Sequence, residues 1–161
     1  MRRAIRVIAK SDWVPTQAKG TVTLSFEDRF RRRVRLLDDA GQAFLLDLPH
    51  ATRFEDGDGL VLEGGGELMV RAAVEDVLDI VGTDTQHTAR LAWHIGNRHT
   101  PIEVLHGGQL RILYDHVLAH MLEGLGAVTT RLQSKFVPGS GAYDAQPQGD
   151  APHVHAHSHH G

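Results

Sequence analysis

The hydrophobic pattern of this chain changes its period near residue 73, and this change limits the folds that the chain can adopt. Up to about residue 72, short alternating or β-branched runs are separated by turn signals, which is typical of β-strands. The turn signals lie at 38–41, 55–59 and 64–66, where Asp and Gly tolerate the positive φ of tight turns. The predicted strands cover 5–8, 21–26, 31–36, 43–48, 60–62 and 68–70. Six short strands with tight connections predict a small β-sandwich or barrel.

Arginine is concentrated around the third of these predicted strands. The cluster consists of Arg29, Arg31, Arg32, Arg33 and Arg35. Its positive charge is sufficient for a phosphate contact, but three of its members alternate with Val34 and Leu36. Alternate residues of a strand face opposite sides, so we interpret the arginines as one solvated strand face.

From about residue 74 the pattern alternates between strands and helices. One helix is predicted to begin at Thr83 or Asp84, which can cap its first turn, and to end at Gly96. A second helix has Asp115 in its first turn and ends by Gly126. Its predicted apolar face consists of Val117, Leu118, Met121, Leu122 and Leu125. With strands at 77–81, 102–105, 110–113 and 128–137, the order is β-α-β-β-α-β, that of the ferredoxin-like split unit.

After residue 137 the chain is rich in proline and glycine and has few large apolar residues. A segment of this composition buries too little apolar surface to fold, so it is predicted to be disordered. The predicted fold class is therefore α+β, with three parts. They are an N-terminal β domain at 1–73, a ferredoxin-like domain at 74–138 and a flexible His-rich tail at 139–161.

The tail carries five histidines within its last nine residues, and the chain has no cysteine. The five are His153, His155, His157, His159 and His160. Their interrupted spacing differs from the continuous runs of expression tags, so we interpret the tail as natural. Without thiolates, any metal must bind through nitrogen and oxygen. Neutral imidazole suits Ni(II), Zn(II) and Cu(II) alike, so the pattern predicts metal binding without selecting the metal.

The rest of the composition argues against several functions. A formal net charge of −3 gives no support for nucleic-acid binding. No apolar run approaches the roughly 20 residues needed to cross a membrane. Arg6 and Lys10 interrupt the apolar stretch that a signal peptide needs, so we expect a cytoplasmic protein. The sequence also lacks a phosphate-binding loop, which leaves nucleotide hydrolysis to a partner.

Two stretches resemble the urease accessory protein UreE family, a family of nickel metallochaperones. Residues 93–101, WHIGNRHTP, are similar to the family's aromatic-His-Leu-Gly-Asn-Arg-His-x-Pro signature. Residues 115–126, DHVLAHMLEGLG, carry the second match, and weaker similarity lies at 46–49 and 54–60. The resemblance implies a cytoplasmic protein that helps to deliver Ni(II) to apo-urease. It also implies two kinds of partner, the accessory GTPase UreG and the apo-urease accessory complex.

The resemblance further implies a homodimer whose metal site lies on the two-fold axis. His99 ends the Gly-Asn-Arg-His motif and matches the family's central nickel ligand, while His116 matches a peripheral metal-binding histidine. Some members carry His-x-His at this point, whereas this chain has Tyr114 in the first position. Tyrosine is a poor neutral ligand at its usual pKa near 10, so we expect a weaker or differently built peripheral site. His120 lies one helical turn after His116 and is a further candidate.

Two other functions remain open. One is a histidine-rich metal store or a peptide-binding adaptor, which needs no directed transfer. The other is a hydrolytic metal enzyme built from His99, His116 and Asp115. The sequence disfavours the enzyme because no general base stands at a spacing such as His-Glu-x-x-His. We therefore expect a protein without catalytic activity.

We expect the metal capacity of the full chain to fall as the pH drops through roughly 6.5, because each imidazole must lose its proton to coordinate a metal ion. Equilibrium dialysis of nickel against the protein at a series of pH values measures this capacity. A capacity that stays constant from about pH 7.5 to about pH 5 would contradict ligation by histidine.

Overall fold

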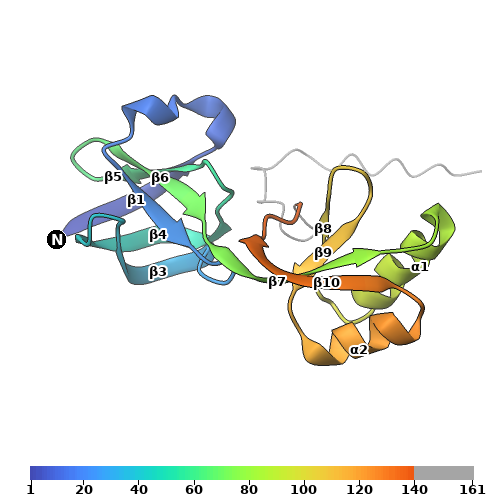
Figure 1. The fold of residues 1–161 in the computed structure, drawn as a ribbon. Helices are drawn as coiled ribbons and strands as arrows, with labels where there is room; N and C mark the ends of the chain where they lie inside the picture. Colours follow the sequence, from blue (N-terminus) through green and yellow to red (C-terminus); the bar gives the residue numbers. More distant parts are fainter. Residues whose placement is uncertain (140–161) are drawn as a thin grey trace, which may run out of the picture.

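The computed structural model describes residues 1–139, which form two β-sheets that follow one another along the chain (Figure 1). The first sheet has six strands in the order β2-β6-β5-β1-β4-β3, and the second has four in the order β10-β7-β9-β8. Two helices accompany the second sheet, so the predicted α+β class is confirmed. The division into domains at 1–73 and 74–138 stays a prediction, and the tail beyond Gly139 lies outside the described residues.

All six strands predicted in the first half are present. They are β1 (Arg2–Ile8), β2 (Gly20–Leu24), β3 (Phe30–Leu37), β4 (Ala43–Arg53), β5 (Gly59–Leu62) and β6 (Glu67–Ala72). Strand β4 continues well past its predicted end at residue 48, through Pro49, and this extension pairs with the start of β3. The pairs β1/β4 and β2/β6 are parallel, whereas the other pairs of this sheet are antiparallel.

The first sheet curls so that its two outer strands approach one another. The backbone N–H of Asp39, in the turn after β3, donates to the carbonyl of Thr21 on β2 at 2.8 Å. The Thr21 hydroxyl in turn donates to the Asp39 carboxylate. The enclosed core is apolar and consists of Ala4, Val22, Leu24, Phe44, Leu46, Leu48, Phe54, Leu60, Leu62, Leu68 and Val70. A curled sheet around one core agrees with the predicted small β-barrel or sandwich architecture.

The arginine-rich strand divides as predicted, with one exception. Arg33 and Arg35 are exposed on β3, while Val34 and Leu36 pack against the core. Arg29, by contrast, is only 2% exposed, so its interpretation as part of a solvated face is wrong. It precedes β3 in a turn, where the alternation of strand faces does not apply.

Arg29 lies buried where the two sheets meet. Its guanidinium donates to the carbonyl oxygen of Leu24 at 3.0 Å and to that of Phe136, just after the last strand. The ring of Phe136 is fully buried and meets Phe26 edge to face, with 5.1 Å between ring centroids. The guanidinium of Arg53 lies 4.1 Å from the centroid of the Phe26 ring. A layer of aromatic rings and guanidinium groups therefore joins the sheets.

The second half has the predicted β-α-β-β-α-β order. Its elements are β7 (Val74–Val81), α1 (Thr85–Gly96), β8 (Glu103–Val104), β9 (Leu110–Leu113), α2 (His116–Gly124) and β10 (Val128–Lys135). Both helices pack on one face of the sheet around Leu78, Ile80, Leu91, Ile95, Leu110, Ile112, Leu118 and Leu122 (Figure 1). None of the helices formed by residues 1–139 is long and apolar enough to cross a membrane.

Each helix begins with an aspartate cap. The carboxylate of Asp84 accepts the backbone N–H of His87 at 2.7 Å, and that of Asp115 accepts those of Val117 and Leu118 at 2.9 and 3.0 Å. The predicted apolar face of α2 is too wide, because Val117 is 51% exposed. At 100° per residue Val117 lies about a quarter turn from Leu118 and faces away from the core.

Replacing Arg29 by methionine is expected to lower the free energy of unfolding by about 2–4 kcal/mol, because two buried carbonyl oxygens lose a charged donor. Urea unfolding measures this loss. The matched control is Arg32→Met on the exposed side of β3, which should change the free energy by about 0.5 kcal/mol or less. Equal effects of the two substitutions would contradict the structural role assigned to Arg29.

Candidate metal site

His99 follows α1 in a tight turn. The backbone N–H groups of Asn97, Arg98 and His99 donate to carbonyls of the last helical turn at 3.0, 3.1 and 3.0 Å. His99 has φ 55° and is the one non-glycine residue of positive φ among residues 1–139. Histidine tolerates this left-handed conformation better than most side chains do. Pro101 then prevents a return to helix, because it favours extended backbone at Thr100. The turn leaves the imidazole of His99 exposed.

The residues just before His99 make contacts that stabilise the loop and the end of α1. The backbone N–H groups of Asn97 and Arg98 hold the loop through their hydrogen bonds to the end of α1. Their side chains are exposed and form no hydrogen bond within the described chain. The ring of His94 meets that of Trp93 edge to face, with 5.0 Å between centroids.

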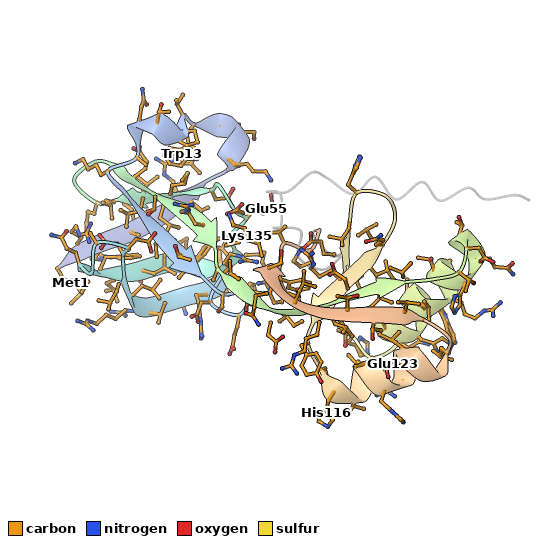
Figure 2. The ribbon with its side chains drawn as sticks, in the orientation of Figure 1. Met1, Trp13, Glu55, His116, Glu123 and Lys135 are labelled. Atoms are coloured by element: carbon orange, nitrogen blue, oxygen red, sulfur yellow. The ribbon has the colours of Figure 1, made fainter. Side chains whose placement is uncertain are left out.

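His99 lines a cleft of about 970 Å³ between the two sheets. On one side are residues 99–104, from the loop after α1 to the end of β8, and on the other are Arg53 at the end of β4 and the two residues that follow it, Phe54 and Glu55. Residues 137–139, where the described chain ends, complete the lining. Figure 2 shows Glu55 and Lys135 at this junction, where the ammonium of Lys135 lies 3.7 Å from the carboxylate of Asp56. The cleft therefore brings His99 and the start of the C-terminal segment together.

One chain, over its described residues, does not hold a complete metal site. Residues 1–139 contain no group of three or more His, Asp or Glu side chains placed to bind one ion. His99 is thus a single exposed ligand, whereas divalent ions of this class take four to six. The predicted ligands His153, His155, His157, His159 and His160 lie outside the described residues. Any site at His99 needs ligands from those residues, from a second chain or from both.

His116 lies away from the cleft. It is the first residue of α2, exposed, and Figure 2 shows it on the helical side of the second sheet. His120 is also exposed one turn later, so both imidazoles are available to solvent. Neither residue lines the cleft that contains His99. The structure therefore does not bring His116 and His99 into one site.

Tyr114, which stands where some family members have a histidine, packs against Arg131. The guanidinium of Arg131 lies 3.7 Å from the centroid of its ring, and the same guanidinium pairs with both carboxylate oxygens of Asp76 at 3.0 and 2.7 Å. The backbone N–H of Tyr114 donates to the carbonyl of Asp76 at 2.9 Å. The hydrogen bonds from Arg131 hold the pKa of the Asp76 carboxyl below its usual value. An aromatic face covered by a cation is a poor position for a metal ligand beside His116.

His87 has a structural role that the sequence does not reveal. The N–H of Thr83 donates to its Nδ1 at 2.9 Å, so Nε2 carries the proton and donates to the carbonyl of Leu125 at 2.8 Å. The imidazole therefore links the start of α1 to the end of α2 through these two hydrogen bonds. No local pattern signals a contact across 38 residues of sequence.

Two family models match the chain. The UreE urease accessory protein, N-terminal domain, matches residues 2–73, and the C-terminal domain of the same family matches residues 75–161.

Individual relatives agree with these matches. The urease accessory protein UreE of Bradyrhizobium sp. (strain BTAi1) is 44% identical over 160 residues, covering 99% of this chain and 74% of that protein. That of Chelativorans sp. (strain BNC1) is 44% identical over 159 residues, covering 99% and 98%. That of Rhodopseudomonas palustris (strain HaA2) is 45% identical over 151 residues, covering 94% and 69%.

The pair formed by Asp76 and Arg131 generates a prediction on stability in acid. Because the folded-state pKa of Asp76 is depressed, its contribution is complete above the unfolded pKa of about 3.9 and disappears as the pH falls through the folded value. Asp76→Asn should therefore lower the urea midpoint at neutral pH and flatten its fall below about pH 4. The exposed Glu27→Gln serves as control. An unchanged slope in Asp76→Asn would contradict this role.

Proposed function

Since the chain belongs to the UreE urease accessory protein family, we propose that it binds Ni(II) and delivers the ion for assembly of the urease active site. A role in urease maturation follows from the family. We propose in addition that the chain binds nickel, that it transfers the ion to a partner, and that histidines are the ligands.

The observation that carries the proposal is the position of His99. Its turn presents an exposed imidazole to the same cleft in which the described chain ends at Gly139. The residues that follow contain five histidines, which begin 14 positions later at His153. A segment of that length spans about 20 Å by random-coil scaling. Histidines of the C-terminal segment are therefore within reach of His99.

A homodimer supplies the second half of the site in this proposal. A two-fold axis beside His99 gives two imidazoles, and histidines from either C-terminal segment complete the coordination. Trp93 and Val104 support such a contact, because they are 62% and 69% exposed and lie on the elements that flank His99. A second copy of the chain can bury such exposed apolar side chains.

Incomplete coordination suits delivery better than a closed cage does, because a cargo ion must leave. We propose that the C-terminal histidines collect ions and pass them to the paired His99 residues. His116 is a weaker capture site on the outer face of α2. The receiving partners are the GTPase UreG and the apo-urease accessory complex in the cytoplasm, and the chain itself catalyses no reaction. The imidazole sites also accept Zn(II) or Cu(II).

Nickel titration calorimetry of the full chain, His99→Ala and a chain ending at Ala151 tests the site, with oligomer mass followed by light scattering. We expect His99→Ala to lose the tightest binding event, while the shorter chain loses mainly weaker ions. His106→Ala, an exposed histidine of the β8–β9 turn, is the matched control and should bind as the wild type does. Unchanged tight binding in His99→Ala would remove the proposed site.

A transfer assay distinguishes a nickel-delivery protein from a nickel-storage protein. Nickel-loaded protein is added to apo-urease with its accessory proteins and a competing chelator, and urease activity is followed over time. A delivery protein activates urease in spite of the chelator, because the ion passes directly between proteins. A storage protein gives no more activity than the same amount of chelated nickel.

A further inference from the structure

Arginines gather on the outer face of three adjacent strands of the first sheet. Strands β1, β4 and β3 lie side by side in this sheet, with β4 in the middle (Figure 1). Leu45 of β4 stands opposite both Arg3 of β1 and Arg35 of β3, and Asp47 stands opposite Arg33. Paired residues share one face of a sheet, and the residue between Leu45 and Asp47 lies in the core. The three arginines therefore face outward, away from the core.

Arg6 extends this face along β1. It pairs with Val61 of β5, whose two neighbours on that strand are buried in the core, so this pair also faces outward. The basic face of the first sheet, as we call it, consists of Arg3, Arg6, Arg33 and Arg35. None of its members lines the cleft that contains His99. The basic face is therefore separate from the proposed metal site.

The basic face carries more positive charge than nearby carboxylates neutralise. The guanidinium of Arg3 lies 2.8 Å from the carboxylate of Asp47 and 3.0 Å from that of Glu63. Arg33 is 4.0 Å from the same Asp47 carboxylate, and its side chain is 68% exposed. The other two arginines are exposed, and their side chains form no hydrogen bond or ion pair within residues 1–139. Four cations share two carboxylates, which leaves an excess of positive charge.

Protection of a sheet edge does not account for this excess. Charged side chains commonly prevent an edge strand from pairing with other proteins, and β3 is such an edge. Strand β1, which carries Arg3 and Arg6, lies inside the sheet between β5 and β4. The basic face is therefore available to an anionic partner.

Apolar side chains lie among the arginines. Leu45 is half-buried between Arg3 and Arg35, and Leu37, farther along β3, is 56% exposed. Ile5 lies at the bulge of β1 and is 37% exposed. Arginine is enriched at protein interfaces, where apolar side chains supply buried area. The mixture is therefore suited to a protein surface.

A nucleic acid fits this face less well. Proteins that bind single strands stack the bases on aromatic side chains, and none of the outward-facing residues named above is aromatic. Duplex binding depends on many phosphate contacts, whereas this chain has a formal net charge of −3.

We propose that the basic face is a docking surface for an acidic segment of a partner protein, in which Asp and Glu alternate with apolar residues. Guanidinium groups bind carboxylates through two parallel hydrogen bonds, which fixes the orientation of the bound segment. The inference does not rest on nickel binding. Because the basic face lies outside the cleft, a docked partner leaves His99 accessible.

A synthetic peptide of repeated Glu-Glu-Leu units is the probe, and the same peptide with Gln in place of Glu is its control. Each peptide is titrated into the isotope-labelled full chain while amide signals are followed by NMR. Salt is kept at about 0.15 M, so that attraction between distant charges is screened. We expect the Glu peptide to shift signals of β1, β4 and β3, and the Gln peptide to leave them unchanged. Equal shifts with both peptides, or shifts confined to other elements, would overturn the proposal.

A triple variant, Arg6→Gln with Arg33→Gln and Arg35→Gln, removes the excess charge and keeps polar side chains. We expect its affinity for the Glu peptide to fall by about tenfold or more, because three ion pairs are lost together. The matched control replaces two exposed arginines of the second half, Arg90→Gln with Arg98→Gln, and should bind as the wild type does. Thermal unfolding establishes that each variant is folded. An equal loss in both variants would show attraction by net charge alone and contradict a defined surface.

Other occupants of the basic face give distinct results. A single-stranded DNA oligonucleotide that bound more tightly than the Glu peptide would replace the proposal with a nucleic-acid surface. Light scattering tests for a second copy of the chain. A mass that rose with concentration in the wild type but not in the triple variant would assign the face to self-association and refute the proposal.

The family's role in urease maturation supplies a natural partner for the second measurement. Binding of the full chain to apo-urease with its accessory proteins is compared for the wild type, the triple variant and the control variant. We expect slower association and a weaker dependence on salt in the triple variant alone. Equal association and equal salt dependence in all three would refute the proposal even if the peptide bound.

This proposal and the proposed function fail separately. If His99→Ala kept the tightest nickel event, the metal site would be wrong, whatever the peptide showed. If His99→Ala lost that event while the triple variant bound the peptide and apo-urease as the wild type does, the metal site would stand and the docking surface would be wrong.

Discussion

A buried guanidinium joins the two halves of this protein. The Arg29 side chain donates to a carbonyl in each half, so the halves cannot separate without breaking its buried hydrogen bond to the carbonyl oxygen of Phe136 and exposing the fully buried Phe136 ring. The covalent link reinforces this contact. A single residue, Ala73, lies between β6 and β7, and its N–H donates to the carbonyl of Leu24 at 2.9 Å. The cleft that contains His99 lies between these halves, so its width depends on how firmly they are joined.

Much of the fold could be predicted because its signals are local. Alternating apolar residues and Gly-rich turns located the strands of the first half. Asp84 as a cap and Asp115 as a first-turn carboxylate located the starts of both helices, and in the structure both are caps, since a short carboxylate accepts N–H groups only a few residues ahead. The family signature singled out His99, and the structure places this residue in an exposed turn at a cleft. The end of β4 was missed because Pro49, which usually marks a strand edge, stands in its middle.

The features that escaped prediction all depend on contacts between distant parts of the sequence. In the sequence, Arg29 looks like the other arginines around it. It is buried because Phe136, more than one hundred residues later, packs beside it and accepts its hydrogen bond. Tyr114 could be called a poor ligand from its chemistry, but its contact with Arg131 across the sheet had no sequence signal. For the tail histidines, by contrast, composition alone predicts affinity for metal, with no need of distant contacts. These histidines lie outside the described residues.

The conformation of His99 sets function against stability. A left-handed backbone at the end of a helix is the position that glycine occupies most readily, and a residue with a β-carbon costs about 1–2 kcal/mol there. Glycine at this point would close α1 at lower free energy and leave no imidazole at the cleft. Selection for stability alone would therefore remove this side chain. Ranking the positions of this chain by how much a glycine would stabilise them offers a way to recognise its functional residues without any knowledge of the ligand.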